Sequence, residues 1–268
     1  ATQISGGELK LYDSSLTLTA GVSMTNSSKL SLKNTNFAGS SKVALTGGTL
    51  ELGGTIGNLS SVQTDTNTSL ELNSDTTISR TDSMEADGLK LNTYSLTLGS
   101  VTTDLTLNSP LLLNNAGSEL ITQGADLVLK DSLQLTKGKI TSTAGTFTFT
   151  KGGSTGTNSI LDLSGTKLKL KEDLSAQNGT LTTNNNSILH LLDNVTVTYN
   201  GEKTFKALEL NGNILTLGSV STDMKVIDAF TMSSNTLKTG DADFTAKVTL
   251  NTNSLLDSTG GTLKISGT

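Results

Sequence analysis

Apolar and polar residues alternate with a period of two along most of the chain. Triplets with leucine on both sides of a polar residue recur throughout, as at residues 9–11 (LKL), 50–52 (LEL) and 89–91 (LKL). This period is typical of a β-strand with one face buried and the other in water. Clusters of Gly, Asn and Ser, such as Gly47-Gly48, separate the triplets and favour turns. The pattern predicts an all-β chain of short strands and leaves 80–87 as the only segment to test for a helix.

The triplets are evenly spaced. Their first residues stand at positions 9, 30, 50, 70 and 89, and the series resumes at 105, 127, 147, 168, 189 and 208. Roughly twenty residues suit one circuit of a parallel β-helix, in which two or three short strands are joined by turns. The predicted fold is therefore a single-stranded parallel β-helix (β-solenoid) with about 20 residues per rung. About thirteen rungs, stacked at the inter-strand spacing of about 4.8 Å, predict a rod on the order of 60 Å long.

A long repeat overlies this short spacing. Residues 88–107 (GLKLNTYSLTLGSVTTDLTL) are similar to residues 207–226 (ALELNGNILTLGSVSTDMKV), so that Leu89 matches Leu208 at an offset of 119 positions. The clearest pair of segments is 66–113 and 185–232. We expect residues 1–268 to form one continuous β-solenoid that contains about two copies of this unit, each with roughly six circuits.

A string of antiparallel β-sandwiches is the alternative architecture, because about 119 residues is a plausible size for a sandwich domain. The chain has no Trp and only 3% aromatic residues, whereas sandwich cores usually contain large aromatic side chains. The even spacing of about twenty residues inside each unit also favours the solenoid. An antiparallel pairing of neighbouring strands would decide for the sandwich.

Composition narrows the classes of function. The net charge is −5 and there is no basic stretch, so we expect no nucleic-acid partner. No apolar run approaches 18 residues, so we expect no membrane-spanning segment. The absence of Cys excludes disulfides and thiolate metal sites. The first residues do not resemble a signal peptide, which implies that a leader was removed or that the sequence is an internal piece.

Few side chains are candidates for chemistry. His190 is the only histidine, and its match in the first copy is Glu71, so we interpret it as an exposed, outward side chain. Asp104 matches Asp223, and Asp126 corresponds to Asp243. Calcium needs several converging oxygens, and glycoside hydrolysis needs two close carboxylates. No adjacent Asp pair or calcium-binding motif occurs, so we interpret these residues as turn aspartates that accept backbone amides.

The densest charged stretch surrounds Arg80, the only arginine, with Glu85 and Asp87 close by. We interpret it as a solvated loop. Nucleotide-binding, serine-hydrolase and zinc-protease motifs do not occur. The prediction is that the chain is not an enzyme and has no catalytic, cofactor-binding or metal-binding residues and no cofactor.

The repeated LTLGSVxTDLTL, GADLxL and STxGT segments resemble the tandem repeats of giant bacterial surface proteins, which are grouped with filamentous haemagglutinin-like adhesins. This resemblance implies a parallel β-helix at the cell surface or outside the cell, and it carries over no functional residue. The expected function is a non-enzymatic section of an adhesin stalk or a subunit of a head-to-tail filament. The expected partners are copies of itself or further repeats, end to end, and surface glycans. The alternative is a β-helix that binds or degrades polysaccharide.

Overall fold

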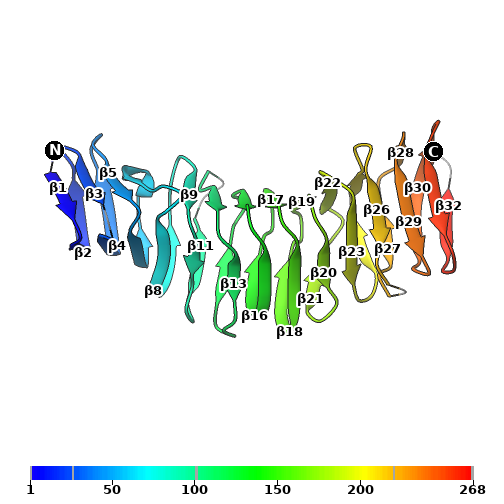
Figure 1. Cartoon of the computed structure of the whole chain (residues 1–268), viewed down its shortest axis with the longest axis horizontal. Helices are drawn as coiled ribbons and strands as arrows, with labels where there is room; N and C mark the ends of the chain where they lie inside the picture. Colours follow the sequence, from blue (N-terminus) through cyan, green and yellow to red (C-terminus); the bar gives the residue numbers. More distant parts are fainter. Residues whose placement is uncertain (1, 26, 100–101, 220, 267–268) are drawn as a thin grey trace.

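The chain winds into a parallel β-solenoid of about 12 turns with about 21 residues per turn. The computed structural model describes residues 2–25, 27–99, 102–219 and 221–266. It runs as an elongated rod from the N-terminal to the C-terminal end (Figure 1). Every strand pairing within the described residues is parallel, from Thr2 with Val22 at one end to Phe244 with Leu263 at the other. The predicted β-helix is confirmed, and the antiparallel sandwiches are excluded.

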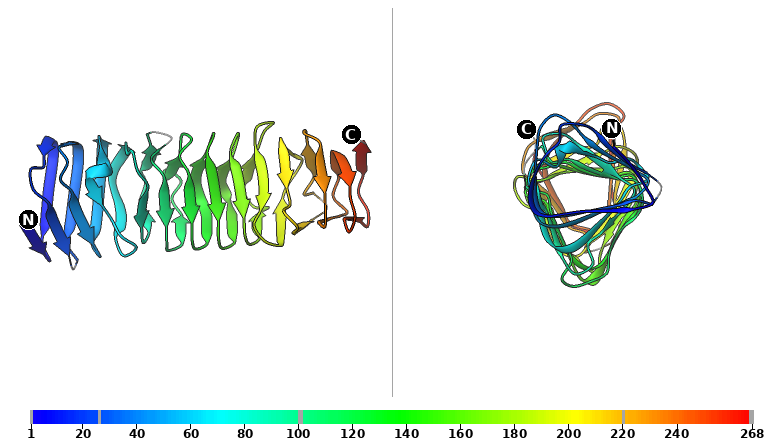
Figure 2. Two further views of the ribbon diagram at one scale, coloured as in Figure 1. Left: turned by 90° about the horizontal axis from the view of Figure 1, so that it is seen from above. Right: turned by 90° about the vertical axis from the view of Figure 1, so that its left-hand side faces the viewer.

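Seen down its axis, the rod has a triangular outline with three faces per turn (Figure 2). The ladder of paired strands that passes through Leu9, Leu30, Leu50, Leu70 and Leu89 is called the first face. The second face follows it in each early turn, for example at residues 76–78, and pairs with residues 96–98. The third face follows next, for example at residues 84–86, and pairs with residues 105–107. Each face therefore takes about seven residues.

The strands that the structure describes belong to four hydrogen-bonded sheets. The four-stranded sheet comprises β1 (Thr2–Ser5), β3 (Val22–Thr25), β5 (Val43–Thr46) and β7 (Val62–Gln63). The seven-stranded sheet comprises β9 (Met84–Ala86), β12 (Leu105–Leu107), β15 (Leu127–Leu129), β17 (Thr146–Phe149), β19 (Lys167–Leu170), β22 (Ile188–Leu191) and β25 (Ala207–Glu209). The five-stranded sheet comprises β24 (Lys203–Phe205), β27 (Met224–Val226), β28 (Phe230–Met232), β30 (Phe244–Leu250) and β32 (Leu263–Ser266).

The largest sheet has sixteen strands and covers the first and second faces over much of the rod. Its long strands bend at the corner between these faces. The sixteen strands of this sheet are β2 (Glu8–Thr17), β4 (Lys29–Ala38), β6 (Thr49–Ile56), β8 (Ser69–Ile78), β10 (Leu89–Lys90), β11 (Ser95–Leu98), β13 (Leu111–Leu113), β14 (Glu119–Ile121), β16 (Leu133–Thr141), β18 (Gly153–Asp162), β20 (Leu174–Ala176), β21 (Thr180–Thr182), β23 (Val195–Tyr199), β26 (Ile214–Leu217), β29 (Thr236–Gly240) and β31 (Leu255–Ser258).

A single narrow core runs inside the three faces. The leucines of the first face are fully or almost fully buried from Leu30 to Leu70, while the polar residues between them point outward. Some larger side chains also lie in the core. The buried rings of Phe147 and Phe149 stack with their centroids 4.4 Å apart. Because each turn buries its inward residues against the turns above and below, the stack shares one core.

Helical structure is almost absent. Residues 80–87, the segment that the sequence left open as a possible helix, contain bends and strand β9 instead. The one short helix that the structure describes is a 3₁₀ turn, η1 (Leu59–Ser61), which follows Asn58 in a left-handed conformation. In the described part of the chain, no helix has both the length and the apolar character that crossing a membrane requires.

The two copies of the repeat have the same strand pairings. Leu70 pairs with Leu89 in the first copy, and Leu189 pairs with Leu208 in the second. The turn after each of these pairs is also the same. Tyr94 donates its backbone N–H to the Leu91 carbonyl at 3.0 Å, and its equivalent, Asn213, donates to the Leu210 carbonyl at 2.9 Å. The sequence repeat is thus a repeat of hydrogen-bonding geometry.

Equivalent residues of the two copies nevertheless lie on different faces. Leu70 lies on the first face, whereas Leu189 lies on the third, five ladder steps beyond Met84. Since Leu70 precedes Met84 by two faces, the offset of 119 residues is about five turns and two thirds, slightly less than the six that the spacing predicts. The second copy is therefore rotated about the rod axis by roughly one third of a turn.

Candidate functional site

His190 lies on the outward side of β22, as expected, but its neighbours cover most of its side chain, which is 18% exposed. Its Nδ1 contacts Glu209 Oε2, and Lys167 Nζ lies 2.7 Å from the same carboxylate oxygen. Asn211 Nδ2 lies 3.2 Å from the other ring nitrogen. Burial alone would raise the pKa of Glu209, but the hydrogen bonds from Lys167 and His190 outweigh it and hold that pKa below its ordinary value. His190 is thus one member of an outward charge network.

The equivalent place in the first copy holds a simpler pair of opposite polarity. Glu71 occupies the position of His190, and Lys90 occupies the position of Glu209. The Lys90 Nζ atom lies 2.9 Å from Glu71 Oε1. This hydrogen bond lowers the pKa of the Glu71 carboxyl and outweighs the opposing effect of burial. Both copies therefore neutralise this position between consecutive turns, with the acid and the base exchanged.

The four repeated aspartates form two corner ladders. Asp104 Oδ1 accepts the backbone N–H of Asp126 at 2.9 Å, and Asp126 Oδ1 accepts that of Thr146 at 2.6 Å. In the second copy, Asp223 accepts the N–H of Asp243 at 2.9 Å, and Asp243 accepts that of Thr262 at 2.6 Å. The amides belong to the next turn and not to sequence neighbours, because stacking brings the corners together. These carboxylates act as hydrogen-bond acceptors that fasten one turn to the next.

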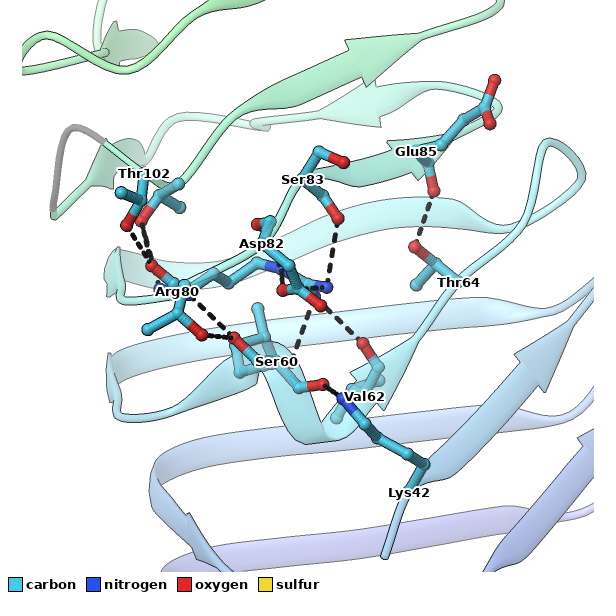
Figure 3. Close-up of polar contacts among 12 residues, drawn as sticks. Lys42, Ser60, Val62, Thr64, Arg80, Asp82, Ser83, Glu85 and Thr102 are labelled. Atoms are coloured by element: carbon cyan, nitrogen blue, oxygen red, sulfur yellow. Dashed lines mark hydrogen bonds and ion pairs between the residues drawn. The ribbon is translucent and has the colours of Figure 1, made fainter. Parts of the chain in front are cut away.

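The interpretation of Arg80 as part of a solvated loop is wrong. Its side chain is only 3% exposed, and its guanidinium lies beside η1 and the start of β7 (Figure 3). Nη1 donates to the carbonyls of Leu59 at 3.0 Å and Val62 at 2.9 Å, and Nη2 lies 2.9 Å from Asp82 Oδ1. Burial lowers the pKa of Arg80, and the Asp82 carboxylate opposes this shift. Arg80 therefore supports a turn in which a short helix replaces part of the ladder.

Glu85 and Asp87, the acidic neighbours of Arg80 in sequence, are engaged elsewhere. Glu85 Oε1 lies 2.6 Å from Lys130 Nζ, two turns further along the rod. Asp87 Oδ1 accepts the Ser109 hydroxyl at 2.6 Å. The structure therefore does not bring the three charged groups into one site. Tyr199, which matches Arg80 in the second copy, is also buried, and its hydroxyl has no hydrogen-bond partner among the residues that the structure describes.

Sequence reasoning also gave no sign of a groove on the first face. Strand β10 pairs with β8 and strand β13 pairs with β16, but no pairing joins β10 to β13 in the described residues. The chain leaves the ladder early because Asn92 adopts a left-handed conformation with φ 56°. Its side-chain amide donates to the Leu72 carbonyl at 2.7 Å and fixes this turn. Pro110, which cannot donate a ladder hydrogen bond, precedes β13 and lines the groove.

These arrangements limit the chemistry available. Within the described residues, no group of three or more His, Cys, Asp or Glu side chains is placed to hold a metal ion. The repeated aspartates are already occupied by backbone amides, and Glu71, Glu85 and Glu209 are paired with lysines. The groove offers binding contacts between apolar and amide side chains rather than a pair of free acid and base groups.

Comparisons with protein-family models, with curated proteins and with solved structures found no significant match to this chain. The fold and the side-chain arrangements above are therefore the basis for any statement about function.

Proposed function

We propose that the chain is a structural, non-enzymatic β-solenoid outside the cell, either a section of a cell-surface adhesin stalk or a subunit of a head-to-tail filament. The observation that carries this proposal is the continuous stack of parallel turns, whose hydrogen bonds run along the rod axis (Figure 2). Its charged side chains support the same role, because several of them join one turn to another. In this proposal the function of the rod is to span a distance while it keeps its shape.

The order of the faces is compatible with end-to-end stacking of copies of this chain. Successive strands follow the order first, second and third face, and β1 belongs to the ladder that precedes the first-face part of β2. At the other end, β31 continues the ladder of β29, and β32 stacks on β30 one face later. A second copy placed after β32 thus begins with the face that comes next. The partner in this proposal is a further copy or a further stretch of similar repeats.

Small-angle scattering and electron microscopy test the rod. A single chain should give a longest dimension of roughly 60 Å, from about 12 turns at about 4.8 Å each. A direct tandem fusion of two chains should roughly double this length while its width stays constant. A compact fusion, or two rods joined at a variable angle, would contradict the proposal.

The location and the lack of activity need separate measurements. Antibodies and added protease should reach the protein on intact cells of its source, and an intracellular control protein should stay protected. Incubation with neutral polysaccharides and polyuronates should release no reducing ends. Turnover that survives extensive purification would reject the non-enzymatic proposal in favour of a polysaccharide-degrading β-helix.

A further inference from the structure

The groove between β10 and β13 is large enough for a ligand. Its volume is about 530 Å³, within the range of small-molecule and oligosaccharide sites. Its lining extends from Thr49 through Ser69 and Gly88 to Pro110, so it crosses four successive turns. Three turn spacings correspond to about 14 Å along the rod axis. A groove of this form suits an extended chain that lies parallel to the axis.

Apolar side chains form part of the groove surface. Leu112 is 53% exposed although its neighbours Leu111 and Leu113 are buried, and the exposed Pro110 lies beside it. The fold does not require an apolar residue at this position. The second copy has the same missing pairing, between β25 and β28, yet it has Thr231 in place of Leu112 and Ala229 in place of Pro110. The apolar surface is therefore a property of this groove and not of the ladder break.

The polar groups of the groove favour an uncharged ligand. Its lining contains one acid and one base, Glu71 and Lys90, and these neutralise each other at 2.9 Å. The other polar groups are hydroxyls and side-chain amides, including Asn114 and Asn115. Amides can donate to and accept from hydroxyl groups, whereas an anionic ligand would have to displace Glu71 from Lys90.

We propose that this groove binds a neutral polysaccharide along the rod axis. A pyranose ring presents C–H faces, which lose water against Leu112 and Pro110, and equatorial hydroxyls, which exchange hydrogen bonds with the asparagine amides. Several consecutive sugar units would occupy the length of the groove. This binding function is additional to the structural role of the rod and does not depend on it.

A glycan array followed by calorimetry with the neutral oligosaccharides that bind tests the proposal. Wild-type protein should bind neutral oligosaccharides of several units at one site per chain. The Leu112→Thr variant, which copies the second unit, should bind roughly tenfold more weakly because it loses apolar contact. Thr231→Leu is the matched control at the equivalent position and should leave affinity unchanged.

A charge variant sharpens the ligand class. Glu71→Gln leaves Lys90 without its acidic partner, so it should gain binding to polyuronate oligosaccharides that the wild type binds poorly. Far-UV circular dichroism should show the same β-structure in all three variants, because the altered side chains lie on the outer surface.

Several results would overturn the inference. They are no binding to any neutral glycan, wild-type preference for polyuronates, or affinity that Leu112→Thr does not change. Binding of apolar peptides but not of sugars would assign the groove to a protein partner instead. None of these results would alter the length of the rod in scattering, so the structural proposal is tested independently.

Discussion

The two copies of the repeat share their strand pairings and turns but differ in most of their side chains. Both have the same pairings, the same left-handed asparagine turn and the same aspartate ladder. Three of the differences change what the segment does: Arg80 is aligned with Tyr199, Glu71 with His190, and Leu112 with Thr231. The shared features all hold turns together, whereas two of the three differences lie outside the core. The comparison separates what the solenoid needs from what each segment adds.

The largest expected effect tests whether the core is packed in the same way in the two copies of the repeat. Leu96→Ala and Leu215→Ala each empty a fully buried position, so each should lower the free energy of unfolding by about 2–5 kcal/mol. The two losses should agree within about 1 kcal/mol, because the two leucines occupy the same place in the repeat. Urea denaturation followed by circular dichroism measures both. A large loss of stability for only one of the two variants would show that the core is packed differently in the two copies.

Arg80 should be the most sensitive charged residue. Arg80→Leu keeps most of the volume but leaves the carbonyls of Leu59 and Val62 without their buried donor. We expect a loss of about 3 kcal/mol in the free energy of unfolding. The exposed Lys90→Leu is the control for loss of a positive charge and should cost less than about 1 kcal/mol. Equal losses in the free energy of unfolding for Arg80→Leu and Lys90→Leu would show that Arg80 contributes no more to stability than an exposed charge does.

The aspartate ladders should contribute alike in both copies. Asp126→Ala and Asp243→Ala each remove the acceptor of a backbone amide in the next turn, and each should cost about 1–2 kcal/mol. Replacement by Asn keeps an acceptor oxygen and should restore most of this stability. Amide hydrogen exchange at Thr146 and Thr262 locates the loss. Unchanged protection of these amides in the Ala variants would argue against the ladder.

The outward charge networks should differ in their response to acid. The folded pKa of Glu209 lies below its ordinary value of 4.5, so the ionised form is stabilised by folding. Its contribution is therefore fully present above about pH 4.5 and is lost as the pH falls through the folded pKa. Carboxyl NMR titration should show the pKa of Glu209 rising in a Lys167→Ala variant. The pKa of Glu71, which is paired with Lys90 instead, should not change there.

The smallest effect is expected at Tyr199. Its hydroxyl is buried and has no hydrogen-bond partner within the described part of the chain, and burial raises the pKa of this phenol, which stays protonated. Tyr199→Phe should change the free energy of unfolding by no more than about 0.5 kcal/mol, in contrast to Arg80→Leu at the equivalent place. Thermal and urea denaturation measure the difference. A loss above 1 kcal/mol would indicate that a buried water bonds the hydroxyl.

The fold was predictable because its main signal is local. Leucines at a period of two mark the inward positions, and their spacing marks the turn, so Leu30, Leu50 and Leu70 could be stacked from sequence alone. The rotation between copies was not apparent, because one face is only about seven residues long and a spacing of about twenty does not resolve it.

The candidate sites were less predictable, because they depend on contacts between turns. Arg80 was predicted to lie in a solvated loop because it belongs to the densest charged stretch, with Glu85 and Asp87. It nevertheless follows the buried Ile78 by two residues, a spacing that places it on the inward side. The groove depends on a pairing that is missing between β10 and β13, and no local pattern reports a missing pairing. The acceptor role of the aspartates was expected, but the identity of the donors required the stacked corners.

The rotation by one third of a turn has a consequence for how such a chain can grow. Equivalent strands of the repeat lie on the first face in one copy and on the third face in the other, and they keep the same pairings within the repeat. The length of a duplicated segment therefore needs to match a whole number of faces, and not a whole number of turns. Insertions or deletions near multiples of seven codons therefore preserve the stack. Successive duplications of this length would point any surface feature in three directions before the first direction returns.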